Sequence, residues 1–288
     1  MMRSRLRIAF GLFICVALSV GMDVARNAGA QTSSDKAPKM KVYISVDMEG
    51  VAGTVTIDQL GPNGFEYGRF RKFMTDGENL LIEDFPADVR IVRSWPRHGG
   101  MMAGLDTSFS AALFVGYHAS TTNPKGVRAH TFSSAHYARV ALNGVAVTEG
   151  EYNAAYAGAK GVPVIFVSGD DIATEEIKSR LGDIETVVTK KALGFHSAET
   201  LTPAASCDKI YAGAKAAFAR LHDFKPYVIK TPVTLEITFK NYTPAELLSY
   251  LRSVQRVDSH TIRFVGKDMD EVDDFEEFVG NYGADLTP

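Results

Sequence analysis

The sequence predicts an α/β fold in which helices flank a mainly parallel sheet, with a smaller α+β lobe towards the C-terminus. Three short runs, at residues 41–46, 111–117 and 162–167, are rich in β-branched and aromatic residues and are bounded by Gly, Pro or charged residues. Such runs are typical of buried strands. Helical stretches near residues 149–160 and 172–181 alternate with them. Strands that alternate with helices indicate a parallel sheet.

The pattern changes after about residue 191. An alanine-rich stretch at 203–221 predicts a helix, residues 227–239 have the pattern of an extended, hairpin-like stretch, and two further helices are predicted at 243–254 and 268–282. We therefore expect an α/β metal-binding catalytic domain over residues 40–191 and a C-terminal α+β lobe over residues 192–288.

The N-terminal segment has the pattern of a secretory signal peptide over residues 1–30. Arginines at positions 3, 5 and 7 precede an apolar run over residues 8–22, and Ala28-Gly29-Ala30 supplies small residues for cleavage. The apolar run is shorter than the ~20 residues that span a bilayer, which disfavours a stable membrane anchor. Residues 31–39 form a polar linker. We expect a secreted protein that resides in the periplasm.

Composition and charge exclude several other classes of protein. The chain has 288 residues, of which 45% are hydrophobic and 23% charged, as in ordinary globular proteins. Its 31 Lys and Arg residues against 34 Asp and Glu residues provide no basic field for nucleic acid. Two cysteines cannot build a disulfide framework, and signal-peptide removal would leave only Cys207.

Acidic residues follow the first predicted strand, where ligands bind in open α/β sheets. Asp47 and Glu49 lie two positions apart, so in an extended chain both carboxylates point the same way. Two carboxylates that face one point repel each other unless a proton or a cation separates them, which favours a metal site. The alternative is a pair of solvated carboxylates at a strand end.

Three more residues are candidates for the same edge of the sheet. His118 directly follows the second predicted strand, His130 lies in a glycine-containing loop, and Glu149 begins a predicted helix. Each has an ordinary alternative role: a hydrogen-bonded loop histidine in the first two cases, and a carboxylate that favours the positive end of a helix in the third. Only their convergence would indicate a site.

The motifs occur in an order that resembles the M55 family of D-aminopeptidases. The segments that carry the resemblance are Ser45-Val46-Asp47-Met48-Glu49-Gly50, Gly116-Tyr117-His118, Gly126 to His130, Glu149 with Asn153, and Val167 to Asp171. It covers the chain from about Met40 to the C-terminus. The sequence lacks the Gly-x-Ser-x-Gly elbow, the His-Glu-x-x-His helix and the phosphate loop of other common enzyme classes.

The resemblance implies a homo-oligomeric binuclear zinc hydrolase that removes an N-terminal D-residue, such as D-Ala, from short peptides. It implies that Asp47 bridges two Zn²⁺ ions, that Glu49 completes one site, and that His118 with Glu149 holds the other. It makes His130 the catalytic residue, either as an acid–base group or as a donor to the oxyanion. Two adjacent metals can hold a hydroxide between them and polarise the carbonyl, which fits a hydrolase.

The sequence departs from the family pattern after Thr75. Family members continue there through a helix, a strand and an Asp-Ser-His segment whose histidine binds zinc, whereas this chain runs directly into the following segment. On the order of 25–30 residues are absent, judged by the usual size of a βαβ unit. The site of Glu49 would then keep two protein ligands, fewer than the three of an ordinary catalytic zinc. His98, the nearest histidine downstream, lies in a segment that resembles a different loop.

The departure leaves two alternatives to a fully active hydrolase open. One is the same fold with impaired or absent activity, because a zinc-ligand segment is missing. The other is a periplasmic peptide-binding protein that keeps the pocket without the chemistry. Asp170 and Asp171, which follow the third predicted strand, could line the site, although a role in capping the next helix is favoured.

Overall fold

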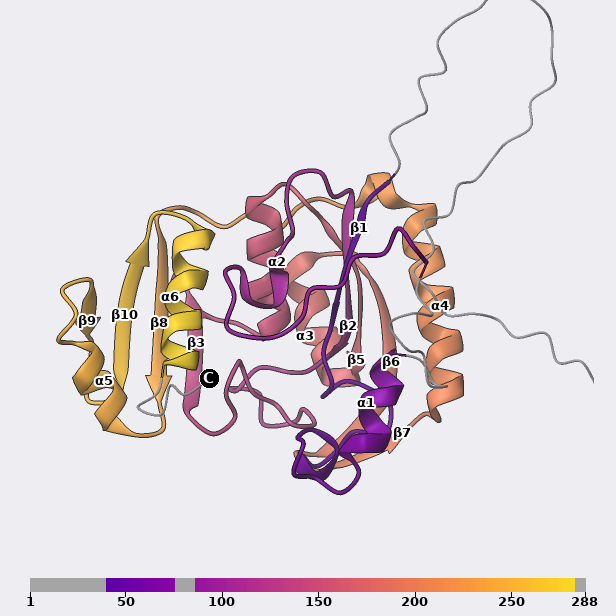
Figure 1. Cartoon of the computed structure of the whole chain (residues 1–288), viewed down its shortest axis with the longest axis horizontal. Helices are drawn as coiled ribbons and strands as arrows, with labels where there is room; N and C mark the ends of the chain where they lie inside the picture. The colour runs from indigo at the N-terminus through magenta and orange to yellow at the C-terminus, as the bar shows by residue number, and fades with distance from the viewer. Residues whose placement is uncertain (1–39, 76–85, 283–288) are drawn as a thin grey trace, which may run out of the picture.

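The computed structural model describes residues 40–75 and 86–282 (Figure 1). The signal peptide at 1–30, the linker at 31–39 and the segment that follows Thr75 lie outside these residues and stay predictions. Within the described ranges, no helix is long and apolar enough to cross a membrane.

The first sheet has the order β1-β2-β5-β6-β7. Its strands are β1 (Val42–Val46), β2 (Ala111–Tyr117), β5 (Val164–Asp170), β6 (Glu185–Gly194) and β7 (Ser197–Thr200). The first four pair in parallel, and β7 returns antiparallel to β6. Every residue of β5 is buried, as expected for an inner parallel strand whose two faces are covered.

Helices cover both faces of this sheet. On one face α2 (Glu149–Ala159) packs on β2 and β5, and α3 (Asp171–Leu181) packs on β5 and β6. On the opposite face α4 (Pro203–Ala219) contacts β5 and β6 (Figure 1). The start of α2 is fixed by a capping box, in which the Thr148 side chain accepts from the Glu151 amide and Glu151 reaches back to Thr148. The α/β class with a mainly parallel sheet is confirmed.

The second sheet is antiparallel and has the order β4-β3-β8-β10-β9. Its strands are β3 (Tyr137–Leu142), β4 (Val145–Ala146), β8 (Val233–Phe239), β9 (Val254–Arg256) and β10 (Thr261–Gly266). Buried and half-buried residues alternate along β8, so one face of the sheet is directed to the core. The helix α6 (Met269–Asn281) packs on β8 and β10 and also contacts α2.

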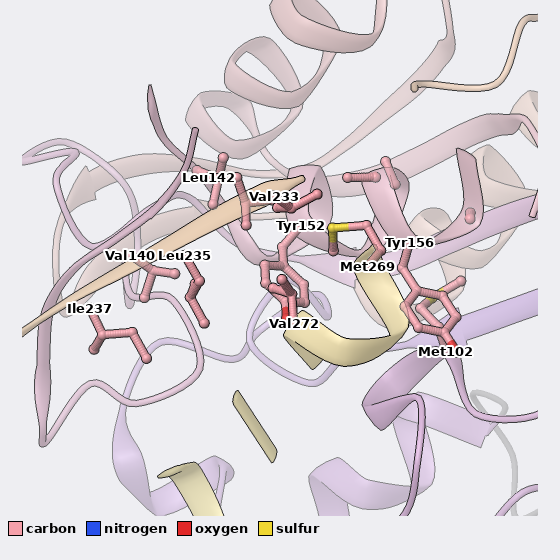
Figure 2. Close-up of a cluster of buried hydrophobic side chains, with 14 of the residues drawn as sticks. Met102, Val140, Leu142, Tyr152, Tyr156, Val233, Leu235, Ile237, Met269 and Val272 are labelled. Atoms are coloured by element: carbon pink, nitrogen blue, oxygen red, sulfur yellow. The ribbon is translucent and has the colours of Figure 1, made fainter. Parts of the chain in front are cut away.

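A large hydrophobic cluster joins the two sheets through α2. Figure 2 shows Tyr152 and Tyr156 of α2 gathered with side chains of β3, β8 and α6, among them Ile237 and Val272. Tyr152 is completely buried. This packing holds α2 between the sheets, and α2 begins with the candidate ligand Glu149.

The remaining described elements are short. They are η1 (Ile57–Gln59), α1 (Tyr67–Thr75), η3 (Gly100–Met102), η4 (Leu221–Asp223) and α5 (Tyr242–Leu248).

Several sequence predictions need correction. The stretch at 227–239 is not a hairpin: it holds one strand, β8, which pairs with β3 and β10. The helix expected over 243–254 ends at Leu248, and Val254 begins β9. The expected boundary at 191–192 also falls inside β6, because β6 continues to Gly194 and turns back into β7. The two sheets are therefore not separate along the chain. The strands β3 and β4 precede the boundary but belong to the second sheet, whereas β7 and α4 follow it but pack on the first sheet.

Candidate metal centre

The structure brings all five predicted site residues to the carboxyl edge of the parallel sheet. Asp47 directly follows β1, His118 directly follows β2, and Glu149 begins α2. The His118 Nε2 atom lies 3.2 Å from Asp47 Oδ2 and 3.5 Å from Glu149 Oε2. The His130 Nε2 atom lies 3.9 Å from Glu49 Oε1. The convergence that the sequence alone did not establish is thus present.

Two glycines allow the loop after β1 to lie against the end of β2. Gly116 has φ 81°, and a Cβ atom there would lie 2.1 Å from the Asp47 carbonyl oxygen. A Cβ atom at Gly50 would lie 2.3 Å from the Gly116 carbonyl carbon. No side chain fits at either position, so the close approach that puts Asp47 beside His118 depends on glycine.

Lys190 of β6 also holds the loop after β1 in place. Its buried ammonium donates to the backbone carbonyls of Glu49, Val51 and Thr54. The neighbouring Thr189 hydroxyl donates to the Gly50 carbonyl at 2.6 Å. Burial lowers the pKa of Lys190 to about 8, although nearby carboxylates oppose that shift. Lys190 was not among the predicted site residues, because a lysine is usually a surface residue and only its contact with the folded loop shows its role.

The two histidines are oriented by backbone carbonyls. The Nδ1 atom of His118 lies 3.2 Å from the Ala119 carbonyl oxygen, and that of His130 lies 2.7 Å from the Arg128 carbonyl oxygen. A carbonyl can only accept, so each Nδ1 carries the proton and each Nε2 faces the carboxylates with its lone pair when the ring is neutral. Histidines that bind metals usually have such a second hydrogen bond.

The charges of the cluster balance through protons when no metal is bound. Burial and the adjacent Asp47 carboxylate raise the pKa of Glu49 to about 7. Burial opposes protonation of His118, but the carboxylates of Asp47 and Glu149 outweigh it and raise the His118 pKa well above its usual value. A bound cation would replace those protons, because it supplies the same positive charge to the carboxylates.

The pKa values of His130 and Glu149 are lowered, in contrast to those of Glu49 and His118. Burial and the neighbouring His118 lower the pKa of His130, so its imidazole stays neutral near neutral pH. Burial favours protonation of Glu149, but the adjacent His118 and the charge of His130 lower its pKa. The Phe132 amide also donates to Glu149 Oε2 at 2.7 Å, which supports the ionised form.

Two buried atoms at the centre lack partners. Asp47 Oδ2 and His118 Nε2 are inaccessible to solvent and make no hydrogen bond. Buried polar atoms are normally paired, so this pair indicates a missing ligand. Donor atoms of His118, His130 and Glu149 lie within 4.8 Å of one another, and so do those of Asp47, Glu49 and His118. Imidazole and carboxylate donors suit Zn²⁺, and the cluster fits such an ion.

The described residues do not supply three separate ligands to each of two ions. His118 belongs to both donor groups, and its Nε2 atom can bind only one metal. His98 does not fill the place: its side chain is 94% exposed, and its ring bonds to Asp274 at 2.7 Å on α6. Within the described part of the chain, whichever donor group His118 serves, the other group would keep two protein ligands.

The remaining acidic residues and Asn153 have structural roles. Asp170 caps α3, since its Oδ1 accepts from the Ala173 amide at 2.8 Å, and Asp171 Oδ1 accepts from the Ala192 amide at 2.8 Å. Asn153 donates to the Tyr117 hydroxyl at 3.0 Å. The capping interpretation of Asp170 is confirmed.

Known proteins share this arrangement of segments. The family model of peptidase M55, D-aminopeptidase, matches residues 40–77 and 75–276. A D-aminopeptidase of Bacillus subtilis (strain 168) is 29% identical over 258 residues, which cover 80% of this chain and 93% of that protein. The solved structure of the zinc-dependent D-aminopeptidase DppA from Bacillus subtilis, a self-compartmentalizing protease, has a TM-score of 0.78 and 27% identity. It covers 83% of this chain and 96% of that one.

The comparison also shows that residues of the relative have no counterpart here. The alignment runs over 258 residues but includes only 80% of this 288-residue chain, which is fewer residues than the alignment is long. The difference consists of residues of the relative that lie opposite gaps in this chain. The two stretches of the family match meet at residues 75–77, where the sequence departs from the family pattern. Because those stretches span most of the chain and contain all five candidate site residues, the chain belongs to the M55 family of D-aminopeptidases.

Proposed function

We propose that this chain is a zinc-dependent aminopeptidase that removes N-terminal D-residues, such as D-Ala, from short peptides. The observation that carries the proposal is the buried cluster at the sheet edge, in which Asp47 Oδ2 and His118 Nε2 have no hydrogen-bond partner. The D-aminopeptidase relatives, one of them zinc-dependent, support the reaction and the metal.

Different residues of the site would have different roles in peptide hydrolysis. Asp47, Glu49, His118 and Glu149 would hold zinc, which when bound polarises a carbonyl and lowers the pKa of water. His130 lies at the edge of the cluster with Nε2 directed to Glu49, and its lowered pKa keeps it neutral and able to accept a proton.

The zinc stoichiometry follows from the ligands. Two ions per chain are proposed, with Asp47 shared between them, His118 and Glu149 on one ion, and Glu49 on the other. The second ion would bind more weakly, because His118, which both donor groups of the described residues share, can serve only one ion. The unmatched residues of the relative favour a second candidate, the same fold with impaired activity.

Export and assembly complete the proposal. A protein with the N-terminal arginines and apolar run described above is secreted into the periplasm, where short D-alanyl peptides arise from cell-wall turnover. A homo-oligomeric ring that encloses the sites is supported by the self-compartmentalizing relative. Short peptides are the expected partners, and nucleic acid and a stable membrane anchor are not.

Metal analysis combined with hydrolysis of D-Ala and L-Ala amides tests these proposals. The mature protein is purified, its zinc content per chain is measured by mass spectrometry, and release of alanine is followed. About two zinc ions with D-selective hydrolysis supports the active enzyme. One zinc with weak hydrolysis favours the impaired enzyme. Absence of zinc and of hydrolysis, with peptide binding retained, would favour a binding protein instead.

A further inference from the structure

A pocket of about 370 Å³ has His130 on its wall, and Asp47, Glu49 and Glu149 are not among its lining residues. Its wall includes His130, Asn123, Tyr137, Phe195 and Lys240. This volume is near the lower end of the ~300–1,000 Å³ of ordinary ligand pockets, so it suits one or two small residues. His130 therefore borders both the metal cluster and a space for a small ligand.

The pocket is positively charged. None of the described residues that line the pocket carries a carboxylate, and Lys240 supplies an ammonium group. The carboxylates of Asp47, Glu49 and Glu149 belong to the metal cluster and do not line the pocket. A peptide placed with its scissile bond at His130 would have its C-terminal carboxylate attracted to the ammonium group of the pocket.

Lys240 is held at the pocket wall, and its ammonium group keeps N–H donors available for a ligand. It directly follows β8, its backbone amide donates to the His136 carbonyl at 2.8 Å, and its ammonium donates to the Ser134 carbonyl. An ammonium has three N–H donors, of which Ser134 takes one. Lys240 is exposed, so a substrate carboxylate can reach the other two without the cost of burying a charge.

We infer that this pocket is the subsite for the C-terminal part of the substrate, and that Lys240 binds the free α-carboxylate of a di- or tripeptide. The inference rests on the proposed function and deepens it, because it assigns the preferred substrate class: short peptides with a free C-terminal carboxylate. A longer or amidated peptide lacks the charge at this point and loses the ion pair.

The test compares D-Ala-D-Ala with its C-terminal amide, which differ only in that charge. For the wild-type protein we expect kcat/KM for the free acid to exceed that for the amide by roughly two- to fivefold, the usual effect of an exposed ion pair. Lys240→Met should bring the ratio close to one, and Lys240→Arg should restore much of it. Lys125→Met, at an exposed lysine in the nearby loop, is the matched control and should keep the wild-type ratio.

Two results would overturn the subsite. One is a wild-type ratio near one, and the other is an unchanged ratio in Lys240→Met. If the wild-type protein hydrolyses neither substrate, the proposed function fails. Calorimetric binding of the acid and the amide to wild type and Lys240→Met then still tests the subsite, since the same charge-dependent ratio is expected in the dissociation constants. Melting temperatures of all variants separate this effect from loss of folding.

Discussion

The imidazole rings of His118 and His130 lie parallel, with their centroids 3.9 Å apart and 7° between their planes. Their Nε2 atoms approach different carboxylates, those of Asp47 and Glu149 for His118 and that of Glu49 for His130. The stack therefore joins the predicted metal ligands to the predicted catalytic residue in one buried group. Removal of one member should leave the charges of the others without compensation.

Asp47→Ala tests the shared ligand. Asp47 borders His118 and stands in a donor group with Glu49, so its loss removes a ligand from both proposed ions. We expect zinc content to fall below one ion per chain and kcat/KM for D-Ala amide to fall by on the order of 10² or more. Zinc is measured by mass spectrometry after dialysis. Asp208→Asn, an exposed carboxylate on α4, is the control, and unchanged zinc in Asp47→Ala would refute the bridging role.

His130→Ala separates catalysis from metal binding. If His130 acts on the substrate, kcat should fall by about 10²–10⁴-fold while zinc content stays at the wild-type level. The geometry also allows another result, because His130 stands in a donor group with His118 and Glu149. Parallel loss of zinc and turnover would make His130 a metal ligand and would contradict the catalytic assignment.

Much of the first sheet and its site could be predicted from local patterns. The runs that become β2 and β5 are continuous and apolar because inner parallel strands are buried on both faces, whereas β1, at the edge of the sheet, is mostly half-buried. Polar residues that follow such strands lie at one edge by topology, which brings Asp47 and His118 together. These inferences need no knowledge of contacts between distant segments.

The second sheet and part of the site depend on distant contacts. The strand β3 pairs with β8, which is far along the chain, so neither segment reveals its partner. In β6 the charged Lys190 interrupts the apolar pattern because its ammonium binds carbonyls of the loop after β1. A lysine in that role reads as a surface residue until the loop is placed above it.

A buried acid on α6 predicts a pH-dependent stability. Asp273 is buried, its Oδ2 has no hydrogen-bond partner, and burial, followed by the charges of Glu277, Asp274 and Asp270, raises its pKa to about 7. The folded protein therefore binds a proton that the unfolded chain releases at lower pH. Stability is greatest below the unfolded pKa near ~4 and falls as pH rises through about 7.

Asp273→Asn should remove this contribution to the pH dependence. The amide cannot ionise, so the variant should gain stability relative to the wild type at pH 8, on the order of 1–3 kcal/mol, with a smaller gain at pH 5. Urea unfolding at both pH values measures the difference. Asp208→Asn serves again as an exposed control, and a gain of equal size at both pH values would contradict the role of Asp273.

Lys190→Met tests whether the loop clamp positions the metal ligands. The ammonium of Lys190 holds three carbonyls of the segment that carries Glu49, yet it touches no ligand side chain. Groups that orient metal ligands typically change affinity by about 10–100-fold, so we expect the zinc dissociation constant to rise in that range. Zinc saturation restores much of the activity if the clamp acts through metal binding.

The adjacent Lys191 provides a matched control for this experiment. It lies on the same strand but is exposed, so Lys191→Met should keep the wild-type zinc affinity. Lys190→Arg retains a cation with several donors and should recover part of the affinity, although the larger guanidinium must fit a buried space. Competition with a fluorescent zinc chelator measures all three variants. Equal affinities in Lys190→Met and Lys191→Met, or a loss of activity that excess zinc does not relieve, would show that Lys190 stabilises the fold without positioning the metal.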